Sequence, residues 1–427
     1  MPTYIYADNY RGFKGMFFAL KQVNFLVGEN STGKSSILEL IENLADVNFW
    51  AFHPEFGGEF TPRRHFSDLV SLDSPSKRSF TIGAISITKT KAESVHGMLV
   101  TYINNDGRPF PSKISVISDN CIRTVEGNFS KSKGDMLKAY EKTFNRATTC
   151  KDEVDRLQAM ARAHATPANP KTFNSPRVGV PLLLRFSEQL HGKDAARSLQ
   201  QKFRAPSFSR QFVELAPIRT KPKRTYDSPE TPFSPEGDHT PYVIRKRLSS
   251  KTGKEFKEFM HLAGADSGLF RTLSVREYSP EDRAPFEIRV NLDKGELTLD
   301  NVGYGVSQAL PLLVEIFVQP KGSTFAIQQP EVHLHPRAQA AFGDVIASIA
   351  RVDGKQFLIE THSDFTIDRF RMNVKKSGNI ESQILFFERS AGNNKITAID
   401  IKEDGSIGED QPESYREFFL NESLANL

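Results

Sequence analysis

Gly28-Glu29-Asn30-Ser31-Thr32-Gly33-Lys34-Ser35 is the stretch that decides the fold of this chain. It matches the P-loop pattern G-x-x-x-x-G-K-[ST] at every fixed position. The apolar residues 23–27 before it predict a buried strand, and residues 36–41 after it predict the start of a helix that ends near residue 46. Because the motif requires this strand–loop–helix context, the sequence predicts a phosphate-binding loop and not a chance glycine-rich turn.

The residue types of this loop predict a nucleotide triphosphate as ligand. Its backbone N–H groups and the positive end of the following helix face phosphate oxygens. We expect Lys34 to bridge the β- and γ-phosphates and the Ser35 hydroxyl to bind Mg²⁺, so ATP and Mg²⁺ are the expected cofactors. The predicted nucleotide-binding residues are Asn30, Ser31, Thr32, Gly33, Lys34, Ser35 and Ser36.

The composition is that of an ordinary soluble protein. The 427 residues are 38% hydrophobic and 25% charged, and the net charge of +4 permits nucleic acid as a partner without arguing for it. Cys121 and Cys150 lack metal-ligand spacing and suit a reducing compartment. The chain shows no signal-peptide pattern and no apolar run long enough for a bilayer, so we expect a cytoplasmic protein without membrane contact.

The first half of the chain predicts strands and then helices. Residues 4–7 and 16–20 predict two short strands before the P-loop strand, and residues 80–88, 97–103, 114–117 and 121–124 predict an antiparallel β subdomain inserted after the first helix. From residue 133 to residue 203 the spacing of apolar side chains predicts helices: Leu137, Tyr140 and Phe144, then Val154, Leu157 and Ala161, and a further stretch at 182–203. A protruding lid, arm or dimer contact and a packed layer of the same domain are equally compatible with these helices.

The second half predicts parallel strands. Strands at 324–327 and 357–360 are separated by a helix at 338–351, and ligands of such sheets bind at the carboxyl ends of the strands. The P-loop, Gln328 and His362 are expected on that one edge. Residues 300–308 predict a glycine-containing loop that leads into an apolar helix at 309–317, with Pro311 in its first turn.

Two groups of polar residues allow two interpretations each. Arg219, Lys221, Lys223 and Arg224 could contact phosphate, but a solvated basic loop is the favoured interpretation. The histidines at 333 and 335 could form a metal pair, but without a third ligand a turn-structuring role is favoured.

Five segments together resemble ABC-type ATPases of the overcoming-lysogenization-defect-like class, the AAA_15/AAA_21 kind. They are residues 9–13, 28–36, 302–308, 330–336 and 360–363. The resemblance implies an α/β ABC-type P-loop ATPase head, with a mixed sheet, crossover helices and an antiparallel β subdomain. The chain would divide into residues 1–130, with the P-loop and the β subdomain, a helical insertion at 131–205, and residues 206–427, with the remaining motifs.

The resemblance also implies a mechanism in which ATP joins two subunits. Gly303, Gly305 and Ser307 would be a signature loop that meets the γ-phosphate bound by a second subunit, and His362 would touch the γ-phosphate as a switch. A homodimer through ATP is therefore expected, with higher assembly left open. Residues 330–336 would cross the dimer interface.

One departure from the family concerns the metal site. Gln328 stands where the Walker B acid is expected to hold Mg²⁺, and Gln329 stands where many ABC enzymes keep a catalytic glutamate, so Glu331 and Glu360 are the nearest acids. The expected catalytic residues are Lys34, Gln328, Gln329, Glu331 and His362. We hypothesise slow hydrolysis, either as a natural slow switch or through a Glu→Gln exchange that traps ATP.

The similar ATPases include subunits of the PARIS and Septu anti-phage systems, in which a nuclease is encoded separately. The resemblance thus implies an ATP-dependent sensor and scaffold of a bacterial defence system that controls a separate effector, a nuclease or toxin, and is triggered by nucleic acid or a phage protein. The alternative is an SMC-like ATPase that acts on DNA in repair or segregation. A standalone nuclease is disfavoured, because we find no carboxylate cluster of the kind that nucleases use.

Overall fold

The computed structural model describes residues 2–46, 49, 56–57, 64–72, 78–89, 93–128, 135–145, 150–163, 171–175, 211–227, 231–250, 253–279, 284–378, 380–390, 392–408 and 411–424. The chain forms two compact units. The first unit comprises Met1–Lys21, Glu29–Arg210 and Phe387–Ile396. The second comprises Gln22–Gly28, Gln211–Phe386 and Thr397–Leu427.

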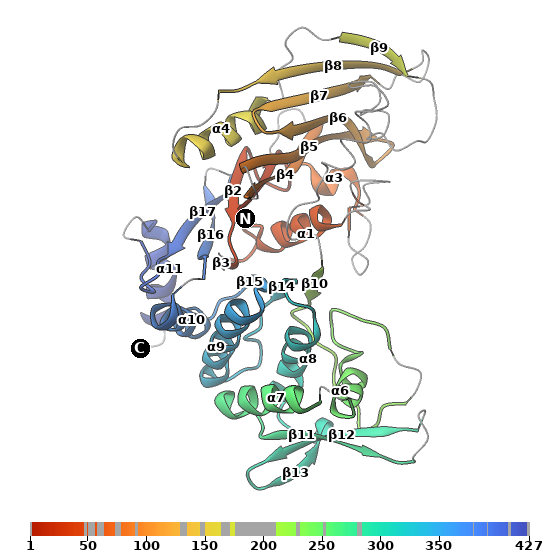
Figure 1. Ribbon diagram of the computed structural model, residues 1–427, viewed down its shortest axis with the longest axis vertical. Coiled ribbons are helices and arrows are strands. Elements are labelled where there is room, and N and C mark those ends of the chain that lie inside the picture. The colour runs from red at the N-terminus through yellow and green to blue at the C-terminus, as the bar shows by residue number, and fades with distance from the viewer. Residues whose placement is uncertain are drawn as a thin grey trace. The chain divides into compact units, whose positions relative to one another are not determined.

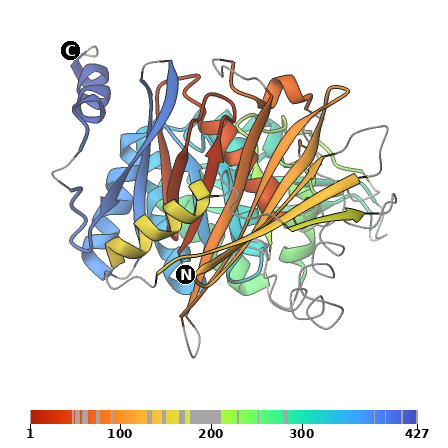
Figure 2. The ribbon, with the colours of Figure 1, turned by 90° about the horizontal axis from the view of Figure 1, so that it is seen from above.

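An eight-stranded antiparallel sheet is the main feature of the first unit (Figure 1). Its strands, in the order β2-β1-β4-β5-β6-β7-β8-β9, are β2 (Met16–Leu20), β1 (Thr3–Asp8), β4 (Ser79–Lys89), β5 (Glu93–Asn105), β6 (Arg108–Ser118), β7 (Cys121–Asn128), β8 (Asp135–Thr143) and β9 (Lys171–Ser175). Seen from above, the strands fan out with the twist that is normal for sheets (Figure 2). The predicted antiparallel β subdomain is confirmed.

Part of the predicted helical insertion is wrong. Leu137 and Tyr140, which predict a helix by their spacing, lie on β8, which pairs with β7 along nearly its whole length and with β9 over residues 135–139. Backbone pairing with two neighbouring strands outweighs the local spacing of three apolar side chains. The structure therefore extends the sheet into the region where the sequence predicts the first helix of the insertion.

One helix of the predicted insertion is confirmed. α4 (Cys150–Ala163) buries Leu157 and Met160 against Ile85, Leu99 and Ile117 of the eight-stranded sheet. It is thus a packed layer on the sheet, one of the two interpretations that the sequence left open. The predicted helix at 182–203 lies outside the described residues. The first unit also contains α1 (Lys34–Ala45), which ends where predicted, and α3 (Phe66–Leu69).

A six-stranded sheet is the centre of the second unit (Figure 1). Its order is β10 (Phe212–Leu215), β14 (Thr324–Gln328), β15 (Gln356–Glu360), β3 (Val23–Gly28), β16 (Ser382–Ser390) and β17 (Asn393–Ile401). The first four strands are parallel. Every residue of β3 is buried, as expected for a parallel strand that is covered on both faces. The predicted mixed α/β architecture with crossover helices is confirmed.

Three helices pack on this sheet and further elements form a second core. α8 (Tyr304–Val318), α9 (Pro336–Asp353) and α10 (Asp364–Ser377) contribute Leu312, Phe342 and Phe370 to the core of the six-stranded sheet. Phe256 and Phe286 belong to the second core. The remaining elements of this unit are α6 (Thr240–Leu248), α7 (Gly253–Ser267), β11 (Thr272–Glu277), β12 (Phe286–Leu292), β13 (Gly295–Thr298), the 3₁₀ turn η1 (Leu299–Asn301) and α11 (Glu413–Leu424).

The start of α8 differs from the prediction. The helix begins at Tyr304 with Gly303 as its N-cap, five residues earlier than predicted, so Pro311 lies in the helix interior and not in the first turn. The glycines at 303 and 305 obscured this start, because glycine lowers helix propensity. Among the described helices, none is long and apolar enough to span a membrane.

Candidate nucleotide-binding site

In the first unit, the P-loop curls around its own lysine. The Lys34 ammonium donates a hydrogen bond of 2.7 Å to the Glu29 carbonyl oxygen, and the Thr32 hydroxyl donates one of 2.7 Å to the same oxygen. Gly33 caps α1 with a φ of 96°, and a Cβ there would lie 2.6 Å from the Phe13 ring. Both facts restrict this position to glycine. The predicted strand–loop–helix context of the motif is confirmed.

The beginning of α1 suits an anion. No side chain caps the helix, and its first turn carries no acidic residue. It therefore brings no negative charge of its own to the place where a phosphate would bind. Ser35 is exposed, and its hydroxyl is in the position that the motif assigns to a Mg²⁺ ligand. The arrangement fits a nucleotide phosphate.

The turn at residues 9–13 holds this helix in place. The Arg11 guanidinium donates two hydrogen bonds, of 2.7 and 2.9 Å, to the two carboxylate oxygens of Glu39 on α1. Asn394 donates a hydrogen bond of 3.3 Å to the Arg11 carbonyl oxygen. Both members of the ion pair are largely buried, so the pair fixes the helix that follows the P-loop.

In the second unit, three parallel strands end side by side. Gln328, the last residue of β14, pairs with Glu360, and Glu360 pairs with Leu26 on β3, the strand that leads into the P-loop. The Thr361 N–H donates a hydrogen bond of 3.2 Å to the Leu26 carbonyl oxygen. The carboxyl ends of β14, β15 and β3 thus share one edge of the sheet, as predicted, and His362 follows β15 there.

A carboxylate that the sequence analysis missed lies beside Gln328. The Gln328 carboxamide donates a hydrogen bond of 2.9 Å to a carboxylate oxygen of Glu214 on β10. Mg²⁺ is bound through oxygen ligands and usually through one or two carboxylates, often with water between. Glu214 and the amide oxygen of Gln328 together supply such oxygens. β14 ends in Gln328 and not in an acid, but the carboxylate of Glu214 reaches this residue from the neighbouring strand β10.

Arg219 is the second residue whose place differs from the prediction. The favoured interpretation placed it on a solvated loop, but its side chain is only 3% exposed. One guanidinium nitrogen, Nη2, donates a hydrogen bond of 3.2 Å to the Gln328 carbonyl oxygen. Burial lowers the pKa of Arg219 to about 10, an effect that the charge of Glu331 partly opposes. Lys221, Lys223 and Arg224 are exposed, as the solvated interpretation requires.

Two nitrogens of the buried Arg219 guanidinium remain unsatisfied. Among the described residues, none accepts a hydrogen bond from its Nε or its Nη1. Unpaired buried donors are costly, so in native proteins they normally meet water, an ion or a ligand. The guanidinium therefore places an unsatisfied positive group beside Gln328, where it suits an anionic acceptor.

Glu331 connects the loops that follow β14 and β15. Its carboxylate accepts a hydrogen bond of 2.8 Å from the Thr361 hydroxyl and one of 2.7 Å from the His362 backbone N–H. Glu360, the other nearby acid, is buried at the end of β15. Gln329 has a φ of 43°, a left-handed backbone conformation that is uncommon for this residue type and often marks functional sites. The His362 side chain is exposed.

Of the three predicted signature residues, Gly303 is the N-cap of α8, and Gly305 and Ser307 lie in its first turn and not in a loop. Gly303 is exposed, and a Cβ at Gly305 would lie 3.0 Å from the His333 carbonyl oxygen. The Ser307 hydroxyl is buried and donates a hydrogen bond of 2.8 Å to the Tyr304 carbonyl oxygen. The ring of Tyr304 contacts that of His333 edge-on at 5.0 Å. This turn is therefore packed against residues 330–336.

The histidine pair has the structural role that was favoured. His335 is the N-cap of α9, and its Nδ1 accepts a hydrogen bond from the Arg337 N–H. His333 adopts a φ of 63° in the turn before it. No group of three or more potential metal ligands occurs among the described residues.

Comparison with known proteins adds two findings on sequence. Residues 183–368 match the AAA_21 family, described as "AAA domain, putative AbiEii toxin, Type IV TA system". An OLD nuclease from Thermus scotoductus is 27% identical over 129 residues. That alignment covers 29% of this chain and 24% of the relative, so this chain matches about a quarter of the length of that nuclease.

Solved structures of SMC head domains are more distantly similar. The SMC head bound to the C-terminal winged-helix domain of ScpA has a TM-score of 0.44 at 12% identity, over 94% of this chain and 98% of that one. The SMC head domain from Thermotoga maritima has a TM-score of 0.37 at 11% identity, over 93% and 98%. This chain therefore combines a complete P-loop at residues 28–35 with a separate stretch, residues 183–368, that is similar to the AAA_21 family.

Proposed function

We propose that this protein is an ATP-binding and ATP-hydrolysing sensor and scaffold of a bacterial anti-phage system that controls a separate effector. The observation that carries the proposal is the complete P-loop after β3, a strand whose sheet ends in Gln328, Glu360 and His362 at one edge. Such an edge is the ligand-binding edge of open α/β sheets. The resemblance described above supplies the biological setting.

In this proposal the P-loop binds ATP, and the residues at the carboxyl ends of β14 and β15 determine how fast ATP is hydrolysed. Lys34 and the amides of residues 30–36 bind the phosphates, and Ser35 holds Mg²⁺, which neutralises phosphate charge. Gln328, paired with Glu214, holds the water shell of the ion. Neither Gln328 nor Gln329 can accept a proton as a carboxylate does, so hydrolysis is slow and the ATP-bound state is long-lived.

Two copies of the chain would close on ATP. Gly303 exposes the beginning of α8, and the N-terminus of a helix attracts phosphate. In our proposal Gly303, Gly305 and Ser307 of one subunit meet the γ-phosphate held by the other, and His362 reports its presence. Ser307 would have to exchange its hydrogen bond to Tyr304 for one to phosphate, which a serine hydroxyl can do by rotation.

The effector is proposed to be a nuclease or toxin on a separate chain. The name of the OLD nuclease relative and the toxin–antitoxin description of the AAA_21 family both support a nuclease or toxin context. Co-purification of the protein with the product of a neighbouring nuclease gene, dependent on ATP, is the expected result. Recovery of the protein without that product under every nucleotide condition would contradict the effector part of the proposal.

The nucleotide part is tested with Lys34→Ala. Binding of radiolabelled ATP should fall by more than tenfold, and ATP-dependent dimerisation, measured by light scattering, should be lost. Lys14→Ala, a lysine of the first unit outside the motif, is the matched control and should behave as the parent. An ATP affinity of Lys34→Ala equal to that of the parent protein would refute the whole proposal.

The alternative function, an SMC-like ATPase that acts on DNA, rests on the exposed charges of Lys221, Lys223 and Arg224. DNA binding that weakens steeply with salt would favour it. The burial of Arg219 removes one of the four charges on which that alternative depends.

A further inference from the structure

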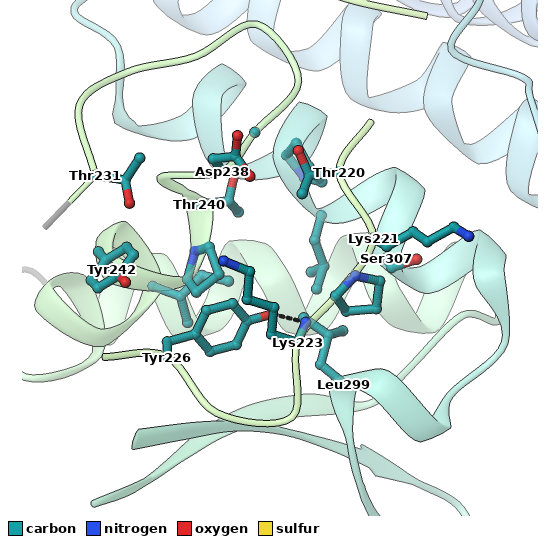
Figure 3. Close-up of a pocket in the computed structure, with 16 residues that line it drawn as sticks. Thr220, Lys221, Lys223, Tyr226, Thr231, Asp238, Thr240, Tyr242, Leu299 and Ser307 are labelled. Atoms are coloured by element: carbon teal, nitrogen blue, oxygen red, sulfur yellow. Dashed lines mark hydrogen bonds between the residues drawn. The ribbon is translucent and has the colours of Figure 1, made fainter. Parts of the chain in front are cut away.

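A cavity of about 260 Å³ opens in the second unit, between the loop after Arg219, the start of α6 and the first two turns of α8 (Figure 3). We propose that this cavity binds a small phosphorylated ligand that carries hydroxyl groups, in the size range of a sugar phosphate. The argument rests on Thr240, Lys223 and Asp238, and the inference does not depend on the proposed ATPase cycle.

Thr240 is the first observation that points to a ligand. This threonine, the first residue of α6, is 3% exposed and lines the cavity. None of the described residues forms a hydrogen bond with its Oγ1. Buried hydroxyl groups are nearly always hydrogen-bonded, so an unpaired one beside a cavity indicates a polar occupant. The first turn of α6 itself has no acidic residue, and Asp238, two residues before Thr240, is the acid of the cavity lining.

Lys223 supplies the positive charge. Figure 3 shows its side chain passing over the ring of Tyr226 toward Thr240, whereas the ammonium of Lys221 points away from the cavity. The Lys223 backbone N–H donates a hydrogen bond of 3.0 Å to the Tyr226 hydroxyl, which fixes the loop at this residue. An ammonium and a hydroxyl that converge on one space match the acceptor oxygens of a phosphate group.

Asp238, which lies next to Thr240, and Thr231 also line the cavity and indicate hydroxyl groups on the ligand (Figure 3). A carboxylate accepts hydrogen bonds from hydroxyl groups but repels a second phosphate. The volume is slightly below the roughly 300–1,000 Å³ of typical ligand pockets, which favours a compact ligand. A monophosphorylated sugar combines the anionic end and the hydroxyl end. A nucleic-acid strand would require an extended groove, so we do not favour it.

The test is isothermal titration of the full chain with ribose 5-phosphate, inorganic phosphate and ribose. Ribose 5-phosphate should bind, inorganic phosphate should bind more weakly, and ribose should not bind measurably. Since the P-loop also attracts phosphate, the titration is repeated in Lys34→Ala, in which the affinity for ribose 5-phosphate should stay within twofold. Loss of binding in Lys34→Ala, or no binding to the parent protein, overturns the proposal.

Three variants locate the site. Lys223→Gln should weaken ribose 5-phosphate binding at least tenfold, and Lys221→Gln, the same exchange two residues earlier, should leave it within twofold. Thr240→Val should weaken binding several-fold without lowering the melting temperature, because it removes a hydroxyl that has no partner in the fold. Unchanged binding in both Lys223→Gln and Thr240→Val refutes the assignment, as does Lys223-dependent binding of a single-stranded oligonucleotide without sugar-phosphate binding.

Discussion

The hydrogen bond between Gln328 and Glu214 allows us to estimate how a Gln328→Glu substitution would change the stability of the protein. In the parent protein a carboxamide donates to a carboxylate at 2.9 Å. Gln328→Glu restores the acid that the Walker B strand is expected to carry, but it places a second carboxylate next to the first one. Without a cation between them, the two groups repel, or one of them takes up a proton.

Repulsion between the two carboxylates and protonation of one of them lead to similar estimates of the loss in stability. Two unit charges about 4 Å apart interact by about 4 kcal/mol at an effective dielectric constant of about 20. Protonation of one carboxyl at pH 7, from an ordinary pKa of about 4.3, costs about 1.36 × 2.7, or about 4 kcal/mol. Since Arg219 offsets part of the charge, we expect Gln328→Glu to lower the free energy of unfolding by about 2–4 kcal/mol at pH 7 without Mg²⁺.

The loss of stability in Gln328→Glu should depend on pH, and its direction follows from the pKa of the carboxyl pair. The folded state raises the pKa of the carboxyl pair above its unfolded value, so the folded state binds more protons and loses stability as the pH rises. The penalty should therefore be largest at pH 7, shrink to about 1 kcal/mol at pH 5 and vanish below about pH 4. Urea unfolding of Gln328→Glu and parent protein at pH 7 and pH 5 measures this difference.

The matched control is the double exchange Glu214→Gln/Gln328→Glu, which restores the amide–carboxylate pair with the charge on β14. It should recover the parental stability, and with Mg²⁺ it should hydrolyse ATP at least tenfold faster than the parent. A Gln328→Glu protein as stable as the parent at pH 7 without Mg²⁺ would refute the pairing. ATPase rates of parent, single and double variants that agree within twofold would refute the role assigned to the missing acid.

Two further predictions concern buried charges. Arg219→Met should raise the free energy of unfolding without ligand by about 1–3 kcal/mol at pH 7, because the buried guanidinium, with its pKa lowered to about 10, costs the folded state desolvation energy. This cost is complete below about pH 10 and declines as the pH rises further. Urea unfolding measures the change in stability, and ATP hydrolysis by the variant should be slower. Arg11→Ala should lower the free energy of unfolding by about 1–4 kcal/mol because, among the described residues, the Glu39 carboxylate then keeps only its two longer hydrogen bonds of 3.3 Å from Arg64. The double variant Arg11→Ala/Glu39→Ala should be less destabilised than Arg11→Ala, and an equal or larger loss would contradict this explanation.

Much of the fold was predictable where local patterns and tertiary structure agree. The run before the P-loop and the strands at 324–327 and 357–360 are short segments of mostly apolar residues, which is how parallel strands that are buried on both faces appear in a sequence. The P-loop motif marks the carboxyl end of the strand before it. Because the strands are parallel, their carboxyl ends could be predicted to lie at the same edge of the sheet. These predictions needed no information about long-range contacts.

The failures occur where a long-range contact decides the outcome. β8 has the spacing of a helix at Leu137 and Tyr140, but pairing with β7 and β9 determines its conformation. β10 has four residues, and Glu214 interrupts its apolar pattern, so no strand was predicted there. For the same reason the pairing of Glu214 with Gln328, 114 positions away, could not be found. Only the parallel pairing of β10 with β14 brings these side chains together.

The arrangement around Glu331 bears on the slow hydrolysis that we propose. A general base needs a lone pair directed at the attacking water and a pKa near the working pH. Both carboxylate oxygens of Glu331 accept hydrogen bonds, from the Thr361 hydroxyl and the His362 N–H. Each carboxylate oxygen has about two lone-pair sites, and these hydrogen bonds occupy one on each oxygen. In our proposal Glu331 acts as the base through one of its remaining lone pairs, while the His362 N–H and the Thr361 hydroxyl hold its carboxylate in place.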